Sequence, residues 1–482
     1  MNEQLALNKI NQAMQQLQQG QPSAARDGLS RVLKAFPDSP ELHFLLGLAL
    51  VQLAQPKGAL THFNRAIALA PELAEAYVNR GILLKNQQQL PQALQDFDRA
   101  IALRPGMAEA YSNRGNVLVL LDQPERARDD FASAIRLDPH NSDALVNLAA
   151  LLADAGDYVS SMAMLESVLS RHPDDALARH NRSWLLLLQG DYARGWPDYE
   201  ARKLDPQLCR RSGLQCFARP EWQGEALAGK TLLLHQEQGL GDAIQMLRYL
   251  PQLQQAGARV LILLNPPLAG LASQLLPAAQ VFTRRAALPA FDLHCPIMSL
   301  PLRMATTLDN IPAAQGYLAV DEAGRRHWAG LLGEKKRLRI GLVWSGAARN
   351  LNDRKRSLTL AALSALLQQD AEWHSLQREY REAPAEVAAA GIIDHAAQLD
   401  TLQDTAGLIS QLDLVISVDT SVAHLAGALG KPCWLLLPFN PDFRWGLGRA
   451  DSPWYASMRL FRQPAPGDWA SVLGEVAGQL AR

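Results

Sequence analysis

Hydrophobic and small residues in the first half of the chain recur with a period of 34 residues. Each period carries a small residue in its first half, then an alanine and an aromatic residue one helical turn apart, then a proline. The matching positions in three consecutive copies are Gly47, Gly81 and Gly115; Ala59, Ala93 and Ala127; Phe63, Phe97 and Phe131; Ala66, Ala100 and Ala134; and Pro71, Pro105 and Pro139. Small residues let two helices cross closely, an aromatic ring fills the remaining gap, and proline ends a helix. The spacing therefore predicts a stack of helix pairs.

This pattern resembles the tetratricopeptide repeat. Five copies cover residues 5–174, and a more divergent sixth unit begins near His180 and includes the sequence GWPDYEAR. In that unit Trp196, Tyr199 and Arg202 look like a junction rather than a further stacking repeat. The resemblance implies a superhelix whose concave groove binds peptide, and we expect this array to occupy residues 1–202.

One asparagine position recurs along the predicted first helices, at Asn79, Asn113, Asn147 and Asn181. Carboxamides can hydrogen-bond a peptide backbone whatever its sequence. The repeat-bearing O-GlcNAc transferases hold an extended acceptor on such a ladder, so the likeness implies that these residues bind a polypeptide acceptor. The alternative is that each asparagine only satisfies a neighbouring helix.

The second half alternates apolar strands with amphipathic helices. We expect a strand over Thr231 to Leu234, a glycine-rich loop ending in Gly241 and Asp242, a helix with apolar positions from Ile244 to Leu253, and a strand over Arg259 to Leu264. This βαβ order predicts a parallel sheet with right-handed crossovers. The loop does not match the dinucleotide fingerprint, because its third glycine and the acidic residue after the second strand are missing.

A second βα series starts near Arg337. The expected strands are RLRIGLVW, Glu372 to Gln377, Leu414 to Val418 and Pro432 to Leu437; a basic loop is expected over Asp353 to Ser357, and helices over Leu358 to Gln369, Leu402 to Leu412 and Asp468 to Leu480. The stretch from Leu412 to Pro432 predicts strand, tight loop and helix. In an open parallel sheet such a loop lies where ligands bind, and the free N–H groups of the helix start suit a phosphate. The alternative is an ordinary buried strand and helix with a Ser/Thr cap.

Composition narrows the class of protein. The chain is 48% hydrophobic and 20% charged, which is typical of a globular protein, and a net charge of -1 argues against nucleic acid as the main partner. The four cysteines form neither a CxxC pair nor a metal-spaced cluster, which favours a reducing compartment. No signal-peptide pattern opens the sequence, and no apolar run reaches about 18 residues, so we expect a cytoplasmic protein without a membrane span.

The C-terminal half resembles the GT-B glycosyltransferases of family 9, the heptosyltransferase-like group. The resemblance rests on Gly241-Asp242, on Trp344-Ser345-Gly346, and on Asp419-Thr420-Ser421-Val422-Ala423-His424 with Gly430-Lys431-Pro432. The whole chain, through GWPDYEAR, EQGLGD, RWGLGR and SPWY, is similar to bacterial proteins that fuse tetratricopeptide repeats to such a domain. The helical periodicity fades over 203–229, which predicts a connector, and the two βα series predict Rossmann-like lobes at 230–320 and 321–482. The resemblance implies that the first lobe is the acceptor side and the second the nucleotide-sugar side. The cleft between the lobes is then the expected ligand site.

The resemblance also implies a nucleotide-sugar donor whose leaving diphosphate is stabilised without a metal or other cofactor. Thr420 and Ser421, at a helix start, are placed for the diphosphate, and Lys355, between Arg354 and Arg356, is the best cation. A carboxylate at Asp419 would repel a diphosphate, so it better suits a sugar hydroxyl or a helix cap. The expected donor-binding residues are Ser345, Gly346, Lys355, Gln377, Asp419, Thr420, Ser421 and His424.

Several of these residues have plain structural alternatives. The basic segment around Lys355 can be a solvated run of charge, Ser345-Gly346 a simple turn, Gln377 an ordinary strand end and His424 a satisfied core histidine. Four residues near the C-terminus can either wall the sugar site or join the lobes, and the second role is favoured: Arg444, Trp445, Trp454 and Tyr455.

An inverting transferase needs a general base on the acceptor hydroxyl. In the heptosyltransferases the aspartate of the first N-lobe loop has this role, which the resemblance carries to Asp242. A carboxylate at a helix start is also a good helix cap, and His235 is a second base candidate.

These expectations describe a metal-independent inverting glycosyltransferase that moves a sugar from a nucleotide sugar to a polypeptide held by the repeats. Two alternatives stay open: a surface-polysaccharide or lipopolysaccharide transferase, and a non-catalytic repeat scaffold with a degenerate GT-B domain. A homo-oligomer is also open.

Overall fold

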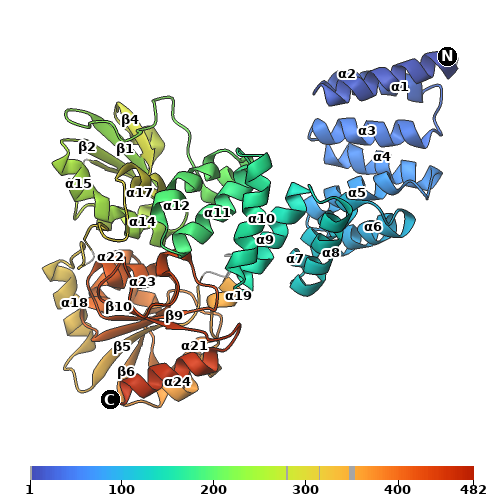
Figure 1. The fold of residues 1–482 in the computed structure, drawn as a ribbon. Coiled ribbons are helices and arrows are strands. Elements are labelled where there is room, and N and C mark those ends of the chain that lie inside the picture. Colours follow the sequence, from blue (N-terminus) through green and yellow to red (C-terminus); the bar gives the residue numbers. More distant parts are fainter. Residues whose placement is uncertain (1–2, 278–279, 314, 347–352) are drawn as a thin grey trace. The chain divides into compact units, whose positions relative to one another are not determined.

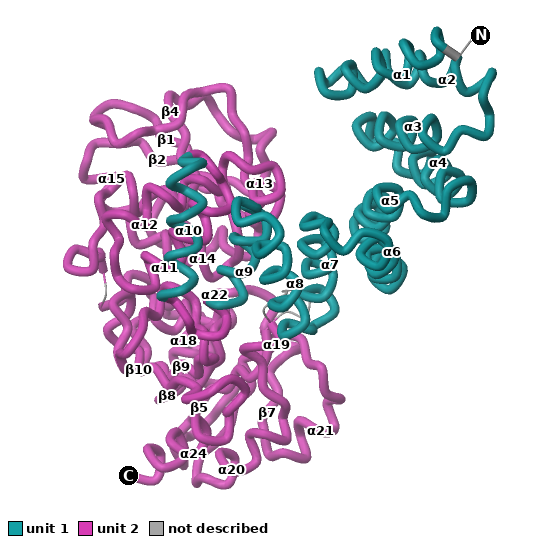
Figure 2. Tube along the Cα trace, turned by 45° about the vertical axis from the view of Figure 1, so that its right-hand side comes forward, with its two compact units in different colours: residues 1–152, 159–173 teal, residues 153–158, 174–482 magenta. Residues whose placement is uncertain are grey.

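The computed structural model of the 482-residue chain describes residues 3–277, 280–313, 315–346 and 353–482 (Figure 1). The chain divides into two compact units (Figure 2). The first contains residues 1–152 and 159–173, and the second contains residues 153–158 and 174–482.

The first unit consists of helices arranged in consecutive pairs, as the 34-residue period predicts. The helices are α1 (Glu3–Gln18), α2 (Pro22–Leu33), α3 (Pro40–Gln52), α4 (Pro56–Leu69), α5 (Ala74–Asn86), α6 (Leu90–Leu103), α7 (Ala108–Leu120), α8 (Pro124–Leu137), α9 (Ser142–Asp154) and α10 (Tyr158–Arg171). A Cβ on Gly81 would lie 2.9 Å from the ring of Phe97, so only glycine lets these two helices approach so closely. The repeat prediction is confirmed together with its physical reason.

Partly buried ion pairs also join the two helices of a repeat, and the sequence reasoning missed them. Arg80 of α5 pairs with Asp96 of α6 at 2.6 Å, and Arg114 of α7 pairs with Asp130 of α8 at the same distance. In the next repeat, Leu148 and Met164 occupy the corresponding positions. An apolar pair therefore takes the place of the ion pair in α9 and α10.

The second unit begins with the sixth helix pair. Its first elements are α11 (Ala176–Leu188), α12 (Tyr192–Tyr199), the 3₁₀ turn η1 (Glu200–Lys203) and α13 (Pro206–Ser212). Tyr192, Trp196 and Tyr199 are buried in the same hydrophobic core as the sheets that follow. The sixth pair thus groups with the C-terminal half, while the expected domain limits at residues 202 and 230 stay predictions.

The N-terminal lobe is a four-stranded parallel sheet. Its strand order is β3 (Val281–Phe282), β2 (Arg259–Leu263), β1 (Thr231–His235), β4 (Leu293–Pro296). Its helices are α14 (Leu240–Met246), α15 (Leu250–Gln255), α16 (Ala269–Ala272) and α17 (Leu300–Arg303). The helix expected from Ile244 to Leu253 is helical throughout but not one α-helix: α14 ends at Met246, the 3₁₀ turn η2 (Leu247–Tyr249) follows, and α15 begins at Leu250 with Pro251 in its first turn. Proline lacks the N–H that a continuous helix needs.

The C-terminal lobe is a six-stranded parallel sheet. Its strand order is β10 (Met458–Arg462), β9 (Cys433–Leu437), β8 (Leu414–Val418), β5 (Leu338–Val343), β6 (Ala371–Ser375), β7 (Ile392–Ile393). Its helices are α18 (Glu322–Leu332), α19 (Asp353–Arg356), α20 (Ser364–Leu367), α21 (Pro384–Ala389), α22 (Leu402–Ser410), α23 (Ser421–Ala428) and α24 (Trp469–Leu480). Numbered along the lobe, the order is 3-2-1-4-5-6 from the β7 edge, which is the Rossmann order.

Both faces of the C-terminal sheet are buried, which explains its continuous apolar strands. Val415 contributes to the core beneath α22 and α23, while its neighbour Ile416 contributes to the core beneath α20 and α24. Two expectations were wrong here: the basic loop is the short helix α19, and the helix expected from Leu358 is delayed, because Thr359 caps a 3₁₀ turn that leads into α20. The fold-class prediction, a helical-repeat array followed by an α/β unit with two parallel sheets, is confirmed.

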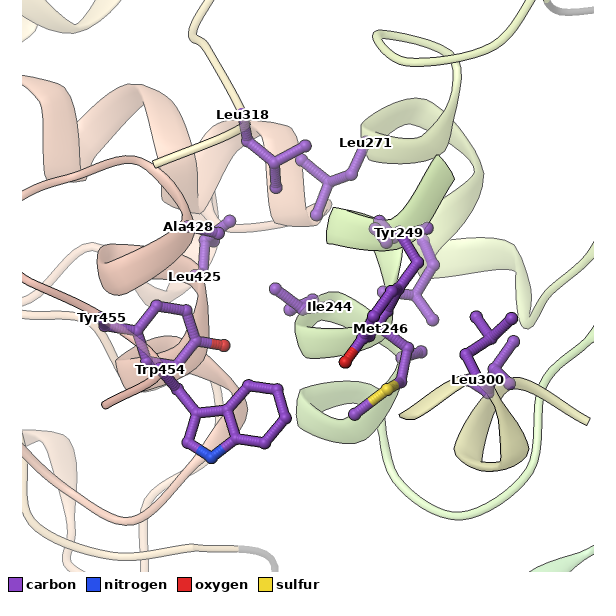
Figure 3. Close-up of a cluster of buried hydrophobic side chains, with 14 of the residues drawn as sticks. Ile244, Met246, Tyr249, Leu271, Leu300, Leu318, Leu425, Ala428, Trp454 and Tyr455 are labelled. Carbon is purple, nitrogen blue, oxygen red and sulfur yellow. The ribbon is translucent and has the colours of Figure 1, made fainter. Parts of the chain in front are cut away.

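One hydrophobic core joins the two lobes (Figure 3). Ile244 of α14 and Leu425 of α23 belong to the same buried cluster as Trp454 and Tyr455. The buried guanidinium of Arg248 donates to the Trp454 carbonyl at 2.8 Å and lies 4.7 Å from the centre of the Tyr455 ring. Trp454 and Tyr455 therefore join the lobes, which is the favoured alternative from the sequence.

Candidate functional site

The C-terminal sheet reverses its strand order between β5 and β8, which are hydrogen-bonded neighbours. Ligands of open α/β sheets bind at such a switch point, beyond the carboxyl ends of the strands. Two of the predicted motifs follow these two strands directly: Trp344-Ser345-Gly346 after β5 and Asp419-Thr420-Ser421 after β8. The topology thus brings together two loops that lie more than seventy residues apart in the sequence.

The start of α23 carries no side-chain cap. Thr420 occupies the N-cap position with an extended backbone, but its hydroxyl contacts Ser417 at 3.2 Å instead of the helix. The first N–H groups of a helix need an outside partner, and together with the helix dipole they suit an anion. This geometry agrees with the expected phosphate contact at Thr420 and Ser421.

Gln377 braces the loop after β5. Its carboxamide oxygen accepts from the backbone N–H groups of Trp344 and Ser345, at 2.7 and 2.9 Å. Its amide nitrogen donates to the Ser345 hydroxyl at 3.2 Å. The side chain is buried and engaged within the protein. These contacts match the structural alternative for Gln377, and its expected contact with the nucleotide stays a prediction.

In the basic segment Arg356, and not the expected Lys355, lies beside the loop after β8. Lys355 is half exposed and pairs at 2.7 Å with Asp154, which belongs to residues 153–158 of the second unit. Its neighbour Arg356 instead donates to the backbone carbonyl of Asp419 at 2.5 Å. A Cβ on Gly346 would meet the Asp353 carboxylate first and would lie 2.7 Å from the Arg356 guanidinium, which pairs with that carboxylate at 3.3 Å, so the glycine lets this ion pair approach the loop after β5. Arg356 therefore lies at the switch point, and the role of Lys355 stays a prediction.

Asp419 has an environment that disfavours its charge. Burial, followed by repulsion from Asp442, raises the pKa of Asp419 to about 6, although Trp445 donates to its carboxylate at 3.0 Å. The imidazole of His424 lies 3.9 Å from the other oxygen. A carboxyl group that titrates near neutrality can hydrogen-bond a sugar hydroxyl or, when protonated, tolerate a phosphate.

His424 is a buried, neutral histidine that lies at the lobe boundary. Burial and then the charges of Arg444 and Arg248 lower the pKa of His424 well below its usual value. Its Nδ1 shares a hydrogen bond with the Tyr455 hydroxyl at 2.9 Å. A Cβ added to Gly241 would lie only 2.6 Å from the His424 ring, so the glycine loop of the N-lobe packs directly on α23.

Asp242 is held at both carboxylate oxygens. One oxygen accepts from the backbone N–H of Gly239, the N-cap residue of α14, at 2.7 Å. The other accepts from the guanidinium of Arg444, which comes from the C-lobe. Arg444 is itself buried and fixed by Gln245 at 2.6 Å and by Asp442 at 2.8 Å. The N-cap expected as an alternative is Gly239 and not Asp242, which is the third residue of α14 and binds the N–H of that cap; the catalytic role of Asp242 stays a prediction. The other base candidate, His235, is buried and shares a hydrogen bond with His294 at 3.1 Å.

A polar cavity of about 350 Å³ lies at the carboxyl edge of the N-lobe sheet. The residues that line it are Ser212, Gly213, Gln215, Gln236, Glu237, Gln238, Leu263, Leu264, Asn265, Thr283 and Arg285. Its wall includes Glu237 and Gln238, which belong to the loop that leads to Asp242. Carboxamides, hydroxyls and one guanidinium dominate the lining, so the cavity suits a neutral or anionic hydrogen-bonding group.

The four asparagines of the predicted ladder lie on the first helices of their pairs and are half-buried. Asn79 and Asn113 each donate to the backbone carbonyl four residues earlier, at 2.9 and 3.1 Å. A carboxamide oxygen can still accept while its nitrogen is engaged in this way. Acceptor binding at Asn147, Asn181 and the other two stays a prediction.

Sequence reasoning treated Tyr199, Arg202 and Arg444 as junction residues and did not connect them with Asp242. Each contacts the glycine loop or its aspartate from a distant part of the chain. These residues lie in two segments rich in aromatic and charged residues, GWPDYEAR and RWGLGR, and this composition was the only sequence feature that could have pointed to them.

Comparisons with known proteins agree with the architecture. Three tetratricopeptide-repeat family models match residues 10–74, 80–153 and 143–175, and the model of glycosyltransferase family 9 (heptosyltransferase) matches residues 370–436. Protein FlbA of Caulobacter vibrioides is 28% identical over 361 residues. That match covers 68% of this chain and only 59% of FlbA. The resemblance to repeats joined to a family 9 domain is confirmed, and it supports a glycosyltransferase.

Solved structures resemble parts of the chain. The Pseudomonas aeruginosa protein pilF is 21% identical, with a TM-score of 0.39, over 42% of this chain and 93% of that one. A tetratricopeptide-repeat protein of Thermus thermophilus is 24% identical, with a TM-score of 0.34, over 38% of this chain and 99% of that one. Among the helices of the described ranges, none has the length and apolarity to cross a bilayer.

Proposed function

We propose that the C-terminal unit transfers a sugar from a nucleotide-sugar donor, whose diphosphate binds at the start of α23. The support is the uncapped helix start at the switch point, with Arg356 beside it. The observation that carries the proposal is the contact between Gly241 and His424, because it joins the loop of Asp242 to that helix. The candidate base, Asp242 of the N-lobe, and the candidate anion site, at the start of α23 in the C-lobe, thus lie on elements that contact each other.

The proposed reaction is an inverting displacement. The acceptor oxygen attacks the anomeric carbon, its proton passes to Asp242, and the bond between that carbon and the diphosphate oxygen breaks. The charge that develops on the diphosphate is stabilised by the N–H groups of α23 and by Arg356 without a metal. An ionised carboxylate has about four lone-pair positions, so the contacts with Gly239 and Arg444 leave room for an acceptor hydroxyl.

We propose a polypeptide as the acceptor. The repeat array supports this choice, since such arrays use their grooves to bind peptides. The polar cavity beside Gln238 would take the part of the acceptor next to its reacting hydroxyl. A carbohydrate acceptor is the second candidate, because the same carboxamide and hydroxyl lining suits sugar hydroxyls.

Thermal shift with a panel of UDP-, GDP-, ADP- and CMP-linked sugars tests donor binding. A donor at about 100 times its dissociation constant stabilises the folded unit by about 2.7 kcal/mol. We expect one nucleotide class to raise the melting temperature, and Arg356→Met to weaken that shift. If no member of the panel changes the melting temperature, the donor proposal fails and the scaffold alternative is favoured.

Replacing the four ladder asparagines by alanine separates the two acceptor classes. A polypeptide acceptor held by the array should lose affinity in this variant, while the donor-induced thermal shift stays unchanged. Unchanged affinity for the acceptor would exclude capture of a peptide by the ladder and favour the carbohydrate.

A further inference from the structure

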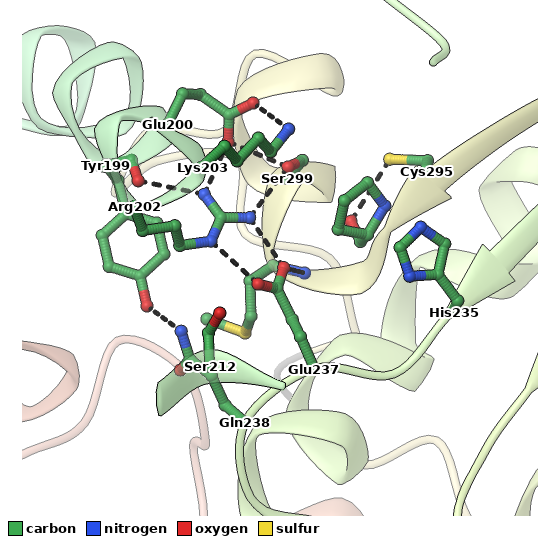
Figure 4. Close-up of polar contacts among 12 residues, drawn as sticks. Tyr199, Glu200, Arg202, Lys203, Ser212, His235, Glu237, Gln238, Cys295 and Ser299 are labelled. Carbon is green, nitrogen blue, oxygen red and sulfur yellow. Dashed lines mark hydrogen bonds and ion pairs between the residues drawn. The ribbon is translucent and has the colours of Figure 1, made fainter. Parts of the chain in front are cut away.

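The sixth helix pair contacts the loop that carries Asp242 (Figure 4). The sequences GWPDYEAR and EQGLGD, about forty residues apart, meet through two side-chain pairs. Arg202 binds Glu237, and the Tyr199 hydroxyl accepts a hydrogen bond from Gln238 at 2.6 Å. The divergence of the sixth unit from the repeat pattern therefore coincides with contacts to the proposed catalytic loop.

Arg202 and Glu237 form a fully buried ion pair. Two guanidinium nitrogens donate to the two carboxylate oxygens, at 2.9 and 2.6 Å. Arg202 also donates to Ser299 at 2.9 Å, and Glu237 accepts from the backbone N–H of Met298 at 3.2 Å. A buried pair with such complete hydrogen bonding fixes one arrangement of the loop, since any shift would leave a charge unpaired.

Gln238, the next residue of the loop, has an unfavourable backbone conformation. Its φ of +62° lies in the left-handed region, which a residue with a side chain adopts only when its surroundings impose it. The surroundings here are the Tyr199 hydroxyl on its side chain and the Ser212 carbonyl, which accepts from its N–H at 2.6 Å. The following residue, Gly239, presents the N–H that binds Asp242.

Tyr199 also contacts the second support of Asp242. Its ring meets the ring of Phe443 edge to face, with centroids 5.9 Å apart. The guanidinium of Arg444, which binds the other oxygen of Asp242, lies 4.5 Å from the centre of that Phe443 ring. Tyr199 therefore contacts a neighbour of each group that binds the Asp242 carboxylate: Gln238, which precedes Gly239, and Phe443, which packs on Arg444.

We propose that Tyr199, backed by Arg202, is a positioning residue for Asp242, so that the last helix pair forms part of the transferase site. This inference rests on the proposed function only where transfer is measured; the geometry of the loop stands without it. The residue acts through Gln238 and Phe443 and does not touch the substrate. The sixth helix pair then belongs to the transferase site, while its first helix, α11, also carries Asn181 of the proposed ladder.

Tyr199→Phe tests this proposal, because it removes one hydroxyl and keeps the buried ring. Tyr192→Phe is the matched control. Tyr192 lies on the same helix and is equally buried, and its hydroxyl accepts from Trp454 at 3.0 Å and does not contact the loop of Asp242. By hydrogen exchange of the full chain, we expect the amides of Gly239 and Leu240 to exchange about fivefold faster in Tyr199→Phe than in Tyr192→Phe. Equal exchange in the two variants would refute the proposal whatever the donor is.

Transfer kinetics provide the second measurement, with the sugar nucleotide that the panel identifies. We expect kcat to fall about tenfold in Tyr199→Phe, with the KM for the donor within twofold of wild type, since a misplaced base slows chemistry and not binding. Gln238→Ala should cause a similar loss, and the double variant should lose no more than the worse single variant, because both remove one contact. Additive losses, or an equal loss in Tyr192→Phe, would overturn the positioning role.

The two proposals fail separately. If no donor binds the wild-type chain, the proposed function is refuted, while the exchange measurement still decides whether Tyr199 orders the loop. If Asp242→Asn abolishes transfer but Tyr199→Phe behaves like its control, the function stands and the positioning role of Tyr199 is refuted.

Discussion

Breaking the buried pair of Arg202 and Glu237 should cost the second unit much of its stability. In Arg202→Met, Glu237 stays fully buried and keeps only the 3.2 Å contact with the Met298 N–H. Leaving one partner of a buried ion pair uncompensated costs about 3–5 kcal/mol, whereas replacing both partners by apolar residues is often nearly neutral. We therefore expect a large loss in the single variant and recovery of most of it in Arg202→Met/Glu237→Leu.

Tryptophan fluorescence during urea unfolding measures this loss in the right part of the molecule. All ten tryptophans lie at residue 184 or later, so the signal reports the second unit only. With a denaturant slope of about 2–3 kcal/mol/M, the midpoint should fall by about 1–2.5 M urea. Arg114→Met, which breaks the pair with Asp130 in the first unit, is the control and should leave the fluorescence midpoint in place. A loss below about 1 kcal/mol, or a double variant no more stable than the single one, would refute the reasoning.

Three further predictions follow from the site and the second unit. Gly241→Ala would place a Cβ 2.6 Å from the His424 ring, so calorimetry should find donor affinity reduced about tenfold or more; unchanged affinity would mean that the lobes do not meet as described. Because burial and Asp442 raise the pKa of Asp419 to about 6, donor affinity should increase as pH falls from 7.5 to 5.5, and Asp419→Asn should show a flat profile; an equal slope in the variant would contradict this. Burial and His395 lower the pKa of His374 to about 4 against an unfolded value of 6.5, so protons bind the unfolded chain preferentially below pH 6.5. The unfolding free energy should therefore drop by up to about 3 kcal/mol between pH 6.5 and 4, less so in His374→Leu, and an unchanged pH slope in that variant would exclude His374 as the cause.

The sequence predicted those elements whose signal is local. The strand over Leu414 to Val418 is observed with the predicted bounds, because a strand buried on both faces is a continuous apolar run. The strand from Met458 to Arg462 was missed, since MRLFR carries two arginines and lies at a sheet edge. Pro251, in the first turn of α15, was visible in the sequence but was outweighed by the apolar spacing around it.

The site divides in the same way. Residues that follow predicted strands, such as Ser345 and Thr420, lie at the switch point because strand order alone brings them there. The partners of Asp242 were not predictable by spacing, since Arg444 is 202 residues away in the chain. The sequence predicted Lys355 at the switch point, but Arg356 lies there instead. Which of three consecutive basic residues faces Gly346 depends on the orientation of the four-residue helix α19, and the sequence does not reveal that orientation.

The account depends most on the role of Asp242, and transfer by Asp242→Asn tests it most directly. Asparagine keeps one oxygen, which can accept in place of the carboxylate oxygen that faces either Gly239 or Arg444, and it cannot take a proton from the acceptor at neutral pH. With the donor found in the panel, we expect an unchanged donor-induced thermal shift and a transfer rate reduced by about 10²–10⁴-fold, the usual contribution of a general base. Transfer at the wild-type rate with normal donor binding would contradict the account.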